Sequence, residues 1–359
     1  MKKLIAIFVV AGIFGIYSCK KESSTPISTN YTPGNFKGVF VVNEGNYGGG
    51  DASISFFSNE SPYVNKNLYS SLNSSLPLGD VAQSMTIFKS NAYIVVNNSG
   101  KVVIVSMTDF KKKGTISGIT LPRFFLGIDD TKGYVSNWSD SSVDVVNLQT
   151  LSVVKSIPCG HGPEQMVLIN GKVFVTNVGG YTSDSSVTVI DAASDVVVAT
   201  IPVGVNPNSI RTDVNGKIWV LCGGSLGPDW LPSTPDDVGG KLIQIDPVTD
   251  TIMSNFLFAF DQHPLKLNSN DAGTRLYYLS GTSEYTGRVY DLGITDSTLA
   301  TNPIINSEFY GLGIQPLTGR IYTGRASFPV TSYMLRYQSN GVFIDSASVG
   351  VGPNSFVFN

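Results

Sequence analysis

Aromatic side chains stand beside amides, carboxylates and glycines in several polar segments of this sequence. A flat ring offers apolar contact area, and a neighbouring amide or carboxylate fixes the orientation of whatever binds against it. This combination predicts the binding of a ligand or partner rather than a chemical reaction. The alternative is that each ring packs locally and caps the strands beside it. The aromatic residues concerned are Tyr47, Trp138, Tyr181, Trp230, Tyr285 and Phe328.

Asparagine ends four apolar runs that resemble β-strands: Asn43, Asn97, Asn137 and Asn177. Asparagine at a strand end can satisfy loose backbone groups and tolerates left-handed geometry, which is a structural role. The functional alternative places these amides around the mouth of a central channel, where they would contact a ligand. The ligand-binding residues that we predict are Asn43, Glu44, Asn46, Tyr47, Asn97, Trp138, Asn177, Tyr181, Trp230, Tyr285, Arg325 and Phe328.

Signatures of catalysis are missing from the sequence. It contains no G-x-S-x-G, H-E-x-x-H or P-loop motif, and no repeated tryptophan motif of the quinoprotein propellers. His161 and His263 lie in loops, where we expect solvated side chains, and two histidines alone make a poor metal site. Carboxylates such as Asp236 and Asp237 could support calcium-assisted hydrolysis, but nothing in their spacing specifies it. We therefore predict no enzyme, no catalytic residue, no metal site and no cofactor.

The candidate residues alternate with short apolar runs that recur through the chain. The runs are β-branched and aromatic and are bounded by Gly, Asn, Asp and Pro, so they predict strands. Seven copies of one run end 40 to 58 residues apart, and the basal spacing of 40–45 residues matches a four-stranded propeller blade. The expected fold is all-β, a seven-bladed β-propeller over residues 36–359. The copies are VFVVN (39–43), YIVVN (93–97), GYVSN (133–137), VFVTN (173–177), IWVLC (218–222), LYYLS (276–280) and IYTGR (321–325).

The C-terminus repeats a motif from the middle of the chain. NPNSI at 206–210 opens one repeat unit, and GPNSF at 352–356 opens another within which the given sequence stops. The first unit has a strand at 38–43 and an expected fourth strand around 63–69, but it has no innermost strand of its own. We therefore predict that residues 354–359 pair into the first blade and close the ring, because closure removes an open sheet edge.

A propeller would place the candidate binding residues on one face. The links between the second and third strands of successive blades open on the same face, and these links carry the aromatic residues. The longest link, at 223–240, is expected to act either as a lid or as a docking arm. A buried pocket lined by Trp138, Trp230 and the strand-end asparagines would favour capture of a small molecule. A flat face with the rings splayed outward would favour a scaffold that binds a protein or polysaccharide.

The N-terminus has the pattern of an export signal. Lys2 and Lys3 precede an apolar run at 4–16 that is too short to span a bilayer, and Ser18 stands directly before Cys19. This pattern predicts a lipoprotein signal at 1–18, lipidation of Cys19 and a polar tether at 19–35. The alternative is ordinary signal cleavage beside an incidental cysteine.

Charge and cysteine content limit the partners and the covalent structure. The net charge is -3, and the single basic run in the body, at 111–113, has only three residues, so we expect no binding of nucleic acid. Cys159 and Cys222 remain after removal of the signal and belong to different repeat units. We therefore expect two separate thiols rather than a disulfide.

Several repeat segments resemble known families. SVTVID (186–191) and NPNSI (206–210) are similar to the propeller repeats of YncE-type exported bacterial proteins. NEGNYGGGDASISFF (43–57) and LGDVAQSM (78–85) resemble lipid-anchored propellers of Bacteroidetes, a group that includes the BtuG-type surface lipoproteins. The resemblance implies a lipid-anchored protein on the outer membrane, facing the cell surface, that captures cobalamin or another nutrient for a TonB-dependent transporter. It also implies that residues 43–47 lie near the binding surface.

Overall fold

The computed structural model describes residues 36–59 and 64–359. The predicted signal at 1–18, the lipidated Cys19 and the tether at 19–35 lie outside the described residues. Within the described part of the chain, no helix has both the length and the apolar character needed to cross a membrane.

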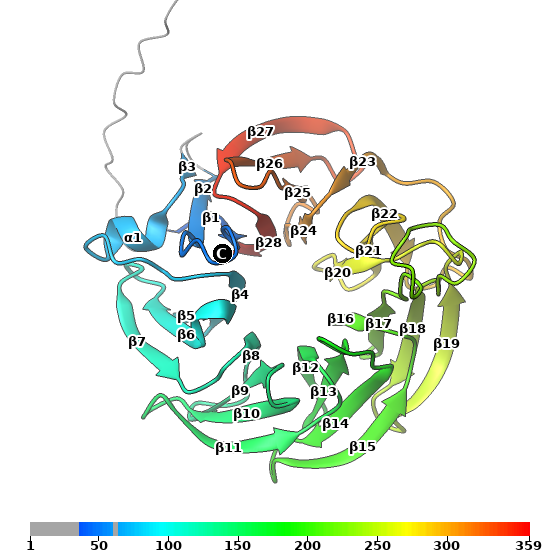
Figure 1. Ribbon diagram of the computed structural model, residues 1–359, viewed down its shortest axis with the longest axis horizontal. Helices are drawn as coiled ribbons and strands as arrows, with labels where there is room; N and C mark the ends of the chain where they lie inside the picture. Colours follow the sequence, from blue (N-terminus) through cyan, green and yellow to red (C-terminus); the bar gives the residue numbers. More distant parts are fainter. Residues whose placement is uncertain (1–35, 60–63) are drawn as a thin grey trace, which may run out of the picture. The chain divides into compact units, whose positions relative to one another are not determined.

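The described residues form an all-β propeller arrangement of five separate four-stranded sheets and one eight-stranded sheet (Figure 1). Two short helical segments accompany the strands, α1 (Leu68–Leu72) and the 3₁₀ turn η1 (Asn97–Ser99). The four-stranded sheets are β4 (Ala82–Phe88), β5 (Asn91–Val96), β6 (Lys101–Ser106), β7 (Lys112–Ser117); β8 (Pro122–Gly127), β9 (Lys132–Asn137), β10 (Ser142–Asn147), β11 (Ser152–Pro158); β12 (Pro163–Ile169), β13 (Lys172–Asn177), β14 (Ser186–Asp191), β15 (Val196–Pro202); β16 (Pro207–Thr212), β17 (Ile218–Cys222), β18 (Lys241–Asp246), β19 (Thr251–Leu257); and β20 (Leu265–Ser269), β21 (Arg275–Ser280), β22 (Gly287–Gly293), β23 (Ile305–Phe309). The eight-stranded sheet runs in the order β27 (Phe343–Val349), β26 (Ser332–Tyr337), β25 (Ile321–Arg325), β24 (Gly311–Ile314), β28 (Pro353–Phe358), β1 (Gly38–Asn43), β2 (Ser53–Ser58), β3 (Val64–Asn65).

Burial changes across each sheet, as the sheet formed by β12 to β15 illustrates. Strands β13 and β14 are almost wholly buried, whereas β15 alternates between exposed and covered residues at the outer edge. The middle strands read as continuous Val, Ile and Phe because neighbouring sheets cover both of their faces. Asn170 and Gly171, both with positive φ (52° and 74°), form the tight turn that leads into β13.

The hydrophobic core is divided among the interfaces between neighbouring sheets. Val189 of β14 packs in one cluster with Ile210 of β16 and Val220 of β17. The innermost strands contact one another in sequence around the centre, from β4 through β8, β12, β16, β20 and β24 to β28 and back to β4 (Figure 1). The apolar cores therefore hold the sheets side by side and surround a central channel.

The C-terminal strand pairs with the first strand of the described chain, as the repeated motif predicts. Strand β28 runs antiparallel to β1, with Val41 opposite Phe356. The N- and C-terminal strands thus share one sheet, so the inner edge of β1 is covered.

The sequence predicts seven blades, and the described residues form five separate four-stranded sheets and one eight-stranded sheet. Strands β24 and β28 are neighbours in the larger sheet through a parallel pairing of Leu312 with Ser355. A Cβ on Gly311 would lie 2.3 Å from the Pro353 carbonyl oxygen, and one on Gly324 would lie 2.1 Å from it. The missing side chains let β28 approach closely enough to join the two sets of strands.

The fourth strand expected around 63–69 is only partly present. Strand β3 has two residues, and helix α1 follows it directly. Leu68 and Tyr69 are almost fully buried, with 1% and 2% of their surface exposed. A helical turn brings both side chains onto the core, which a strand with alternating faces would not do.

The two described cysteines are free thiols, which confirms the expectation of separate residues. Cys222 belongs to the core between the sheets of β12–β15 and β16–β19, and Cys159 packs against another core cluster.

Candidate functional site

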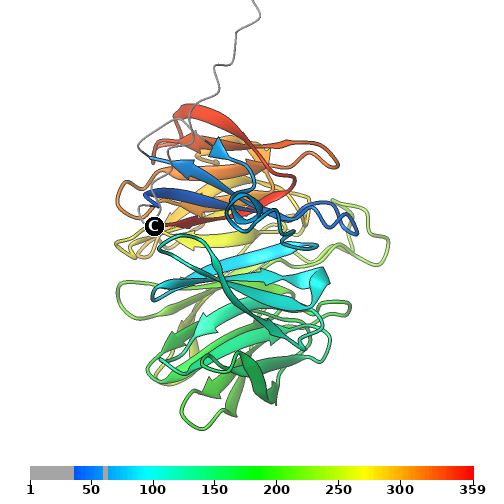
Figure 2. The ribbon, with the colours of Figure 1, turned by 90° about the vertical axis from the view of Figure 1, so that its left-hand side faces the viewer.

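One large cavity of about 1280 Å³ opens at the mouth of the channel. The seven predicted links between second and third strands each contribute at least one lining residue. Figure 2 shows two of these links, the dark blue one after β1 and the yellow-green one after β17, projecting from the same side of the sheets. The wall below them comes from the innermost strands. The predicted links therefore gather on one face, and that face contains a cavity rather than a flat surface.

Five exposed aromatic residues surround the cavity and are called the rim here. The rim residues and their exposed fractions are Tyr47 (83%), Tyr181 (83%), Trp230 (72%), Tyr285 (69%) and Phe328 (52%). Local packing does not account for side chains with this much exposure. Clustered exposed rings around a concave site are typical of a binding surface.

Trp138, the sixth aromatic residue predicted, lies deeper. Its ring centroid is 3.8 Å from the guanidinium carbon of Arg123 and 6.1 Å from the ring of Tyr181. Its indole nitrogen donates a hydrogen bond of 2.9 Å to Glu164. Trp138 therefore combines both predicted roles, because it packs locally and also lines the cavity.

Polar side chains from the innermost strands form the lower wall of the cavity, called the floor here. Six innermost strands have a register shift near their first residues, and a bulge of this kind turns a side chain away from the regular alternation. Five of these shifts supply the floor residues, which are Gln83, Arg123, Glu164, Gln165, Asn208 and Lys266. The sixth, in β28, contains Asn354. One repeated local distortion therefore aims one or two polar groups from successive strands into the channel.

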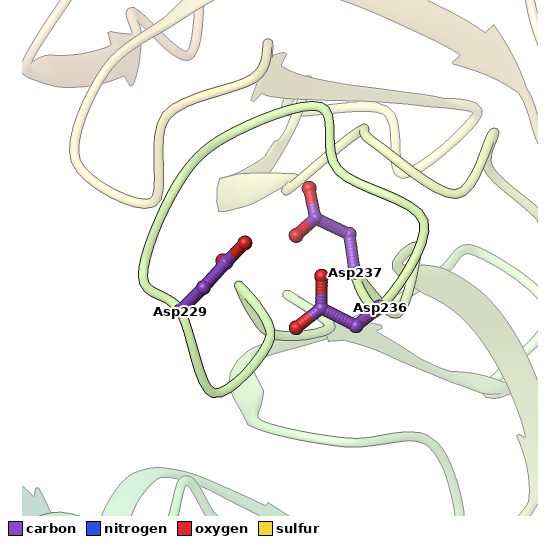
Figure 3. Close-up of side chains that lie close together, drawn as sticks. All are labelled: Asp229, Asp236 and Asp237. Carbon is purple, nitrogen blue, oxygen red and sulfur yellow. The ribbon is translucent and has the colours of Figure 1, made fainter.

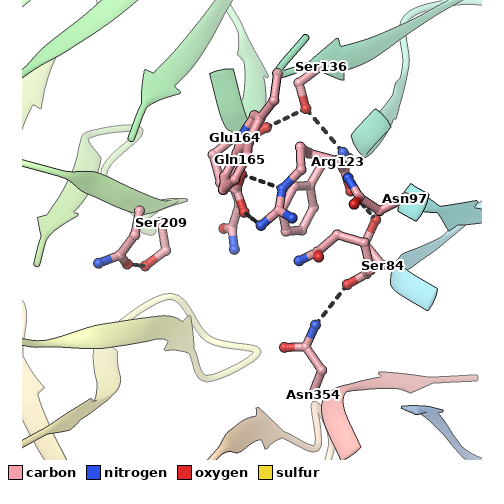
Figure 4. A network of polar contacts seen from close by, with 12 residues as sticks. Ser84, Asn97, Arg123, Ser136, Glu164, Gln165, Ser209 and Asn354 are labelled. Carbon is pink, nitrogen blue, oxygen red and sulfur yellow. Dashed lines mark hydrogen bonds and ion pairs between the residues drawn. The ribbon is translucent and has the colours of Figure 1, made fainter. Parts of the chain in front are cut away.

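Arg123 and Glu164 form a bidentate ion pair in the floor (Figure 4). The guanidinium donates two hydrogen bonds of 2.8 Å to the two carboxylate oxygens, and the side chains are 14% and 8% exposed. Such a bidentate pair between β8 and β12 fixes the orientation of both groups. It also links two neighbouring sheets.

Hydrogen bonds connect other innermost strands in the same manner, and Figure 4 shows part of this network. They run from Asn354 Nδ2 to the Gln83 carbonyl (2.9 Å), from Ser84 Oγ to the Arg123 carbonyl (2.7 Å), from Arg211 Nη1 to Gln165 Oε1 (2.6 Å), from Asn208 Nδ2 to the Pro264 carbonyl (2.9 Å) and from Asn268 Nδ2 to the Leu312 carbonyl (3.3 Å). Burial lowers the pKa of Arg211 to about 10, so this guanidinium stays charged at neutral pH. The floor is therefore preorganised by its own bonds.

Lys266 is the exception among the charged floor residues. Its backbone has φ of +60°, a left-handed conformation that a non-glycine residue in a strand rarely adopts. Its ammonium contacts the amide oxygen of Asn354 and lies 5.8 Å from the ring centroid of Tyr310. Among the described residues no carboxylate lies within ion-pair distance of Lys266 Nζ, and desolvation lowers its pKa although Glu44 and Glu164 oppose the shift. The floor thus offers an amine that an acceptor group of a ligand could contact.

Glu44 and Tyr310 also line the cavity, and the Tyr310 ring lies next to Lys266. The Tyr310 hydroxyl donates a hydrogen bond to Glu44 Oε2. Burial, together with the charge of Glu44, raises the pKa of Tyr310 far above its ordinary value. The tyrosine therefore remains a neutral hydrogen-bond donor at physiological pH.

Eight of the twelve predicted binding residues line the cavity. They are Glu44, Tyr47, Asn97, Trp138, Tyr181, Trp230, Tyr285 and Phe328. Asn97 is half-buried and donates a 3.0 Å hydrogen bond to the Pro122 carbonyl, so part of its bonding capacity is already used.

Four predicted binding residues do not line the cavity. Two of them are strand-end asparagines that have the structural role of satisfying groups within the fold. Asn43 is fully buried and donates a 2.9 Å hydrogen bond to Ser55 Oγ, and Asn177 is fully buried and donates one of 2.9 Å to Thr188 Oγ1. These amides satisfy groups within their own sheets, as the burial of a polar side chain requires. Asn46 bonds to Asp51 outside the cavity, and Arg325 lies over the Phe309 ring.

The floor residues are not among the predicted binding residues, although the sequence contains a signal for them. Four segments place a proline one or two residues before a floor side chain. They are LPRFF (121–125), GPEQM (162–166), NPNSI (206–210) and HPLKL (263–267). The proline is the first residue of the innermost strand in three segments and directly precedes it in the fourth, and a residue that follows it lines the cavity.

His263 is buried, which corrects the expectation that both histidines are solvated. Only 1% of its surface is exposed, and its Nδ1 lies 3.1 Å from the Gly223 carbonyl oxygen. The long segment at 223–240 covers the imidazole, so a residue in a loop is not exposed here. His161 is exposed, as expected.

Comparisons with known proteins support the fold. The sequence profile of a family described as "Domain of unknown function (DUF5074)" matches residues 37–350. A search of curated proteins found no match. A quinoprotein alcohol dehydrogenase-like protein of Bacteroides thetaiotaomicron is similar in structure, with a TM-score of 0.69, 18% identity, and coverage of 90% of this chain and 79% of that one.

Two further structures have similar folds and other activities. The periplasmic gluconolactonase PpgL of Pseudomonas aeruginosa has a TM-score of 0.64 and 13% identity, with 90% and 98% of the two chains covered. Hydrazine synthase of Kuenenia stuttgartiensis has a TM-score of 0.56 and 16% identity, with 74% and 85% covered. Identities this low show only the fold, and one fold carries many functions, so these similarities assign no function to this chain.

Proposed function

The chain belongs to the DUF5074 family, and on this premise we propose that its cavity captures a nutrient molecule. One observation carries the proposal: five exposed aromatic residues surround a single open cavity whose floor consists of preorganised polar groups. Exposed rings supply apolar contact, and fixed polar groups supply orientation. A scaffold that binds a protein or polysaccharide on a flat face would not require a cavity.

The size of the cavity favours a large ligand. Its volume of about 1280 Å³ exceeds the roughly 300–1,000 Å³ of typical small-molecule pockets. Cobalamin is the ligand that we propose, because its apolar macrocycle would lie against the rim and its peripheral amides would meet the amides and charged groups of the floor. A protein loop or a polysaccharide is the alternative occupant.

The N-terminal sequence supports a location for this activity. In the proposal, residues 1–18 are removed, Cys19 carries the lipid and residues 19–35 form the tether. The protein is then held on the outer membrane, faces the cell surface and passes its ligand to a TonB-dependent transporter. The Ser18–Cys19 pattern and the resemblance to BtuG-type lipoproteins support this placement.

We propose that the eight-stranded sheet comprises two blades and that the fold is a seven-bladed propeller. The support is that β24 to β27 and β28 with β1 to β3 each form a four-stranded half, and one parallel pairing joins the halves. We also propose a binding protein rather than an enzyme. The floor groups bond to one another, which suits recognition, although one similar structure is a gluconolactonase.

Calorimetric titration of the purified protein with cyanocobalamin tests the proposal. Saturable one-to-one binding that weakens at least tenfold in Trp230→Ala supports it. Tyr333→Ala is the matched control, because Tyr333 is 49% exposed but lies outside the cavity. If cyanocobalamin produces neither heat of binding nor a shift in melting temperature, cobalamin is not the ligand, and a protein or glycan partner becomes the favoured alternative.

A further inference from the structure

Lys266 is held in the floor by a backbone conformation that is exceptional in this protein. Among the described residues it is the single non-glycine residue inside a strand whose φ lies in the left-handed region, at +60°. The register of β20 shifts between Leu265 and Asn268, so the left-handed residue forms the bulge. Such a conformation costs free energy in a residue with a Cβ, and conformations of this kind cluster at functional sites. Here the distortion accompanies a side chain that lines the cavity.

The amine of Lys266 lacks the acidic partner that other partly covered lysines have. Lys132, Lys172 and Lys217 each form an ion pair with an aspartate, at N–O distances of 2.9, 2.6 and 3.0 Å. Among the described residues no carboxylate lies within ion-pair distance of Lys266 Nζ, and its acceptor is the amide oxygen of Asn354. A protonated amine has three N–H groups, so Lys266 can still donate to a bound molecule.

The carboxylates near Lys266 are already bonded to other groups. Glu164 accepts hydrogen bonds from Arg123, and Glu44 accepts one from Tyr310. Desolvation lowers the pKa of Lys266, although the charges of Glu44 and Glu164 oppose the shift. The positive charge of Arg123 lowers this pKa further. A negatively charged group beside the amine would favour its protonated form. An anion bound there would therefore restore the charge that desolvation disfavours.

Arg123 presents a positive group from the opposite side of the channel. Its strand, β8, is three places from β20 in the ring of innermost strands, which runs β4, β8, β12, β16, β20, β24, β28 (Figure 1). Nε and Nη2 of Arg123 donate to Glu164, and neither bond uses Nη1. Arg123 and Lys266 both line the cavity. An anion between a guanidinium and a protonated amine would meet N–H donors on both sides.

The segment at 223–240 carries the opposite charge at the mouth of the cavity. Three of its aspartates, Asp229, Asp236 and Asp237, lie close together (Figure 3). One carboxylate oxygen of each lies within 4.8 Å of those of the other two, and Asp236 lines the cavity. Because like charges repel, these side chains disfavour an anionic group of a ligand at their part of the mouth. The mouth and the floor together therefore favour a ligand whose anionic end is directed to the floor.

We propose that Lys266, with Arg123 opposite it, forms a subsite for an oxyanion, which is a phosphate or carboxylate group of the ligand that the cavity captures. The ligand then combines apolar surface, which contacts the rim, with at least one negatively charged oxygen group. Cobalamin, with its phosphodiester, fits this class. The inference rests on the proposed function only in that the cavity binds a ligand.

The test is calorimetric titration of the purified protein with sodium sulfate, which stands for a phosphate group, and separately with sodium acetate, at constant ionic strength. We expect saturable one-to-one binding of at least one anion. Lys266→Met keeps a long unbranched side chain but removes the amine, so it should weaken binding at least tenfold. Lys113→Met, at an exposed lysine outside the cavity, should leave the affinity within twofold. No saturable binding of either anion, or unchanged affinity in Lys266→Met, would overturn the proposal.

A measurement on the wild-type protein covers the case in which Lys266→Met folds poorly. Formaldehyde with cyanoborohydride methylates unprotonated lysine amines, and peptide mass spectrometry reports the modification at each lysine. The anion that binds should slow methylation of Lys266 but not of Lys113, because it covers the amine and favours its protonated form. Equal rates at Lys266 with and without the anion would contradict the proposal.

The results also separate this subsite from the proposed ligand. If an anion binds and requires Lys266 while cyanocobalamin does not bind, cobalamin is not the ligand and the subsite remains. If cyanocobalamin binds equally well to the wild-type protein and to Lys266→Met while neither anion binds, the proposed function stands and the subsite does not exist.

Discussion

The floor and the rim of the cavity use polar and aromatic side chains in opposite ways. Floor residues come from bulged innermost strands and form mutual bonds, such as the paired Arg123 and Glu164. Rim residues come from loops and expose most of their rings, as Tyr47 and Trp230 do. The difference indicates that the floor contributes to stability, whereas the rim contributes little to it and is exposed for the binding that we propose.

Deleting residues 354–359 should have the largest effect, because it breaks the ring from which the floor is built. The deletion removes most of β28 and exposes the inner edge of β1. We expect aggregation or loss of cooperative unfolding, measured by circular dichroism on heating and by gel filtration. Removal of Asn359 alone is the control. A shortened chain with an unchanged melting temperature would contradict the role of β28 in closing the ring.

Glu164→Gln should be the most damaging single change in the floor. It leaves the Arg123 guanidinium, 14% exposed, without its charged partner, and loss of one member of a buried pair costs roughly 3–5 kcal/mol. Urea unfolding would measure the change in free energy. Asp130→Asn breaks an ion pair with Lys89 whose members are 85% and 48% exposed, and it should cost less than about 1 kcal/mol. If both substitutions lower the free energy of unfolding by the same amount, the floor does not stabilise the fold more than a surface ion pair does.

Trp230→Ala should separate the rim from the floor. Since the side chain is 72% exposed, we expect the free energy of unfolding to change by less than about 0.5 kcal/mol, while ligand affinity falls at least tenfold. Unfolding and calorimetry on the same sample give both numbers. A large loss of stability would mean that the rim, like the floor, supports the fold.

The smallest effect is expected for the two thiols, Cys159 and Cys222. Their labelling tests whether the core between the sheets opens. Burial raises the pKa of both Cys159 and Cys222 to about 12. Because the folded-state pKa is raised above the ordinary value of about 9, the resulting stability is present below pH 9 and is lost as the pH rises through 12. At pH 8 a disulfide reagent should label Cys222 far more slowly in the native protein than in urea. Equal rates would show that the core opens readily.

Much of the fold can be predicted from repetition in the sequence. The recurring run that ends at Asn43, Asn97 and Asn177 marks buried strands. The second NPNS-like motif, GPNSF at 352–356, predicts that residues 354–359 pair with the first blade, as β28 does with β1. The joining of two sets of strands into one sheet could not be predicted. It depends on how closely β28 approaches Gly311 and Gly324, which is a property of two distant segments in space.

The loop residues that line the cavity could be predicted from the sequence, but the floor residues could not. Tyr47, Tyr181 and Trp230 stand out because large rings are unusual in polar segments. Arg123 and Lys266 do not stand out, because a bulge rather than the strand period aims them inward. Regular alternation would have assigned them to a sheet face.

By itself the sequence determined the strands, the blade period and the face on which the loops gather, because these follow from local periodicity and turn residues. Only the tertiary structure decided which polar groups meet. Asp237 and His263 lie in different units, and their contact depends on how the segment at 223–240 packs against the residues before β20. Such contacts form between residues distant in the chain, so no local pattern encodes them.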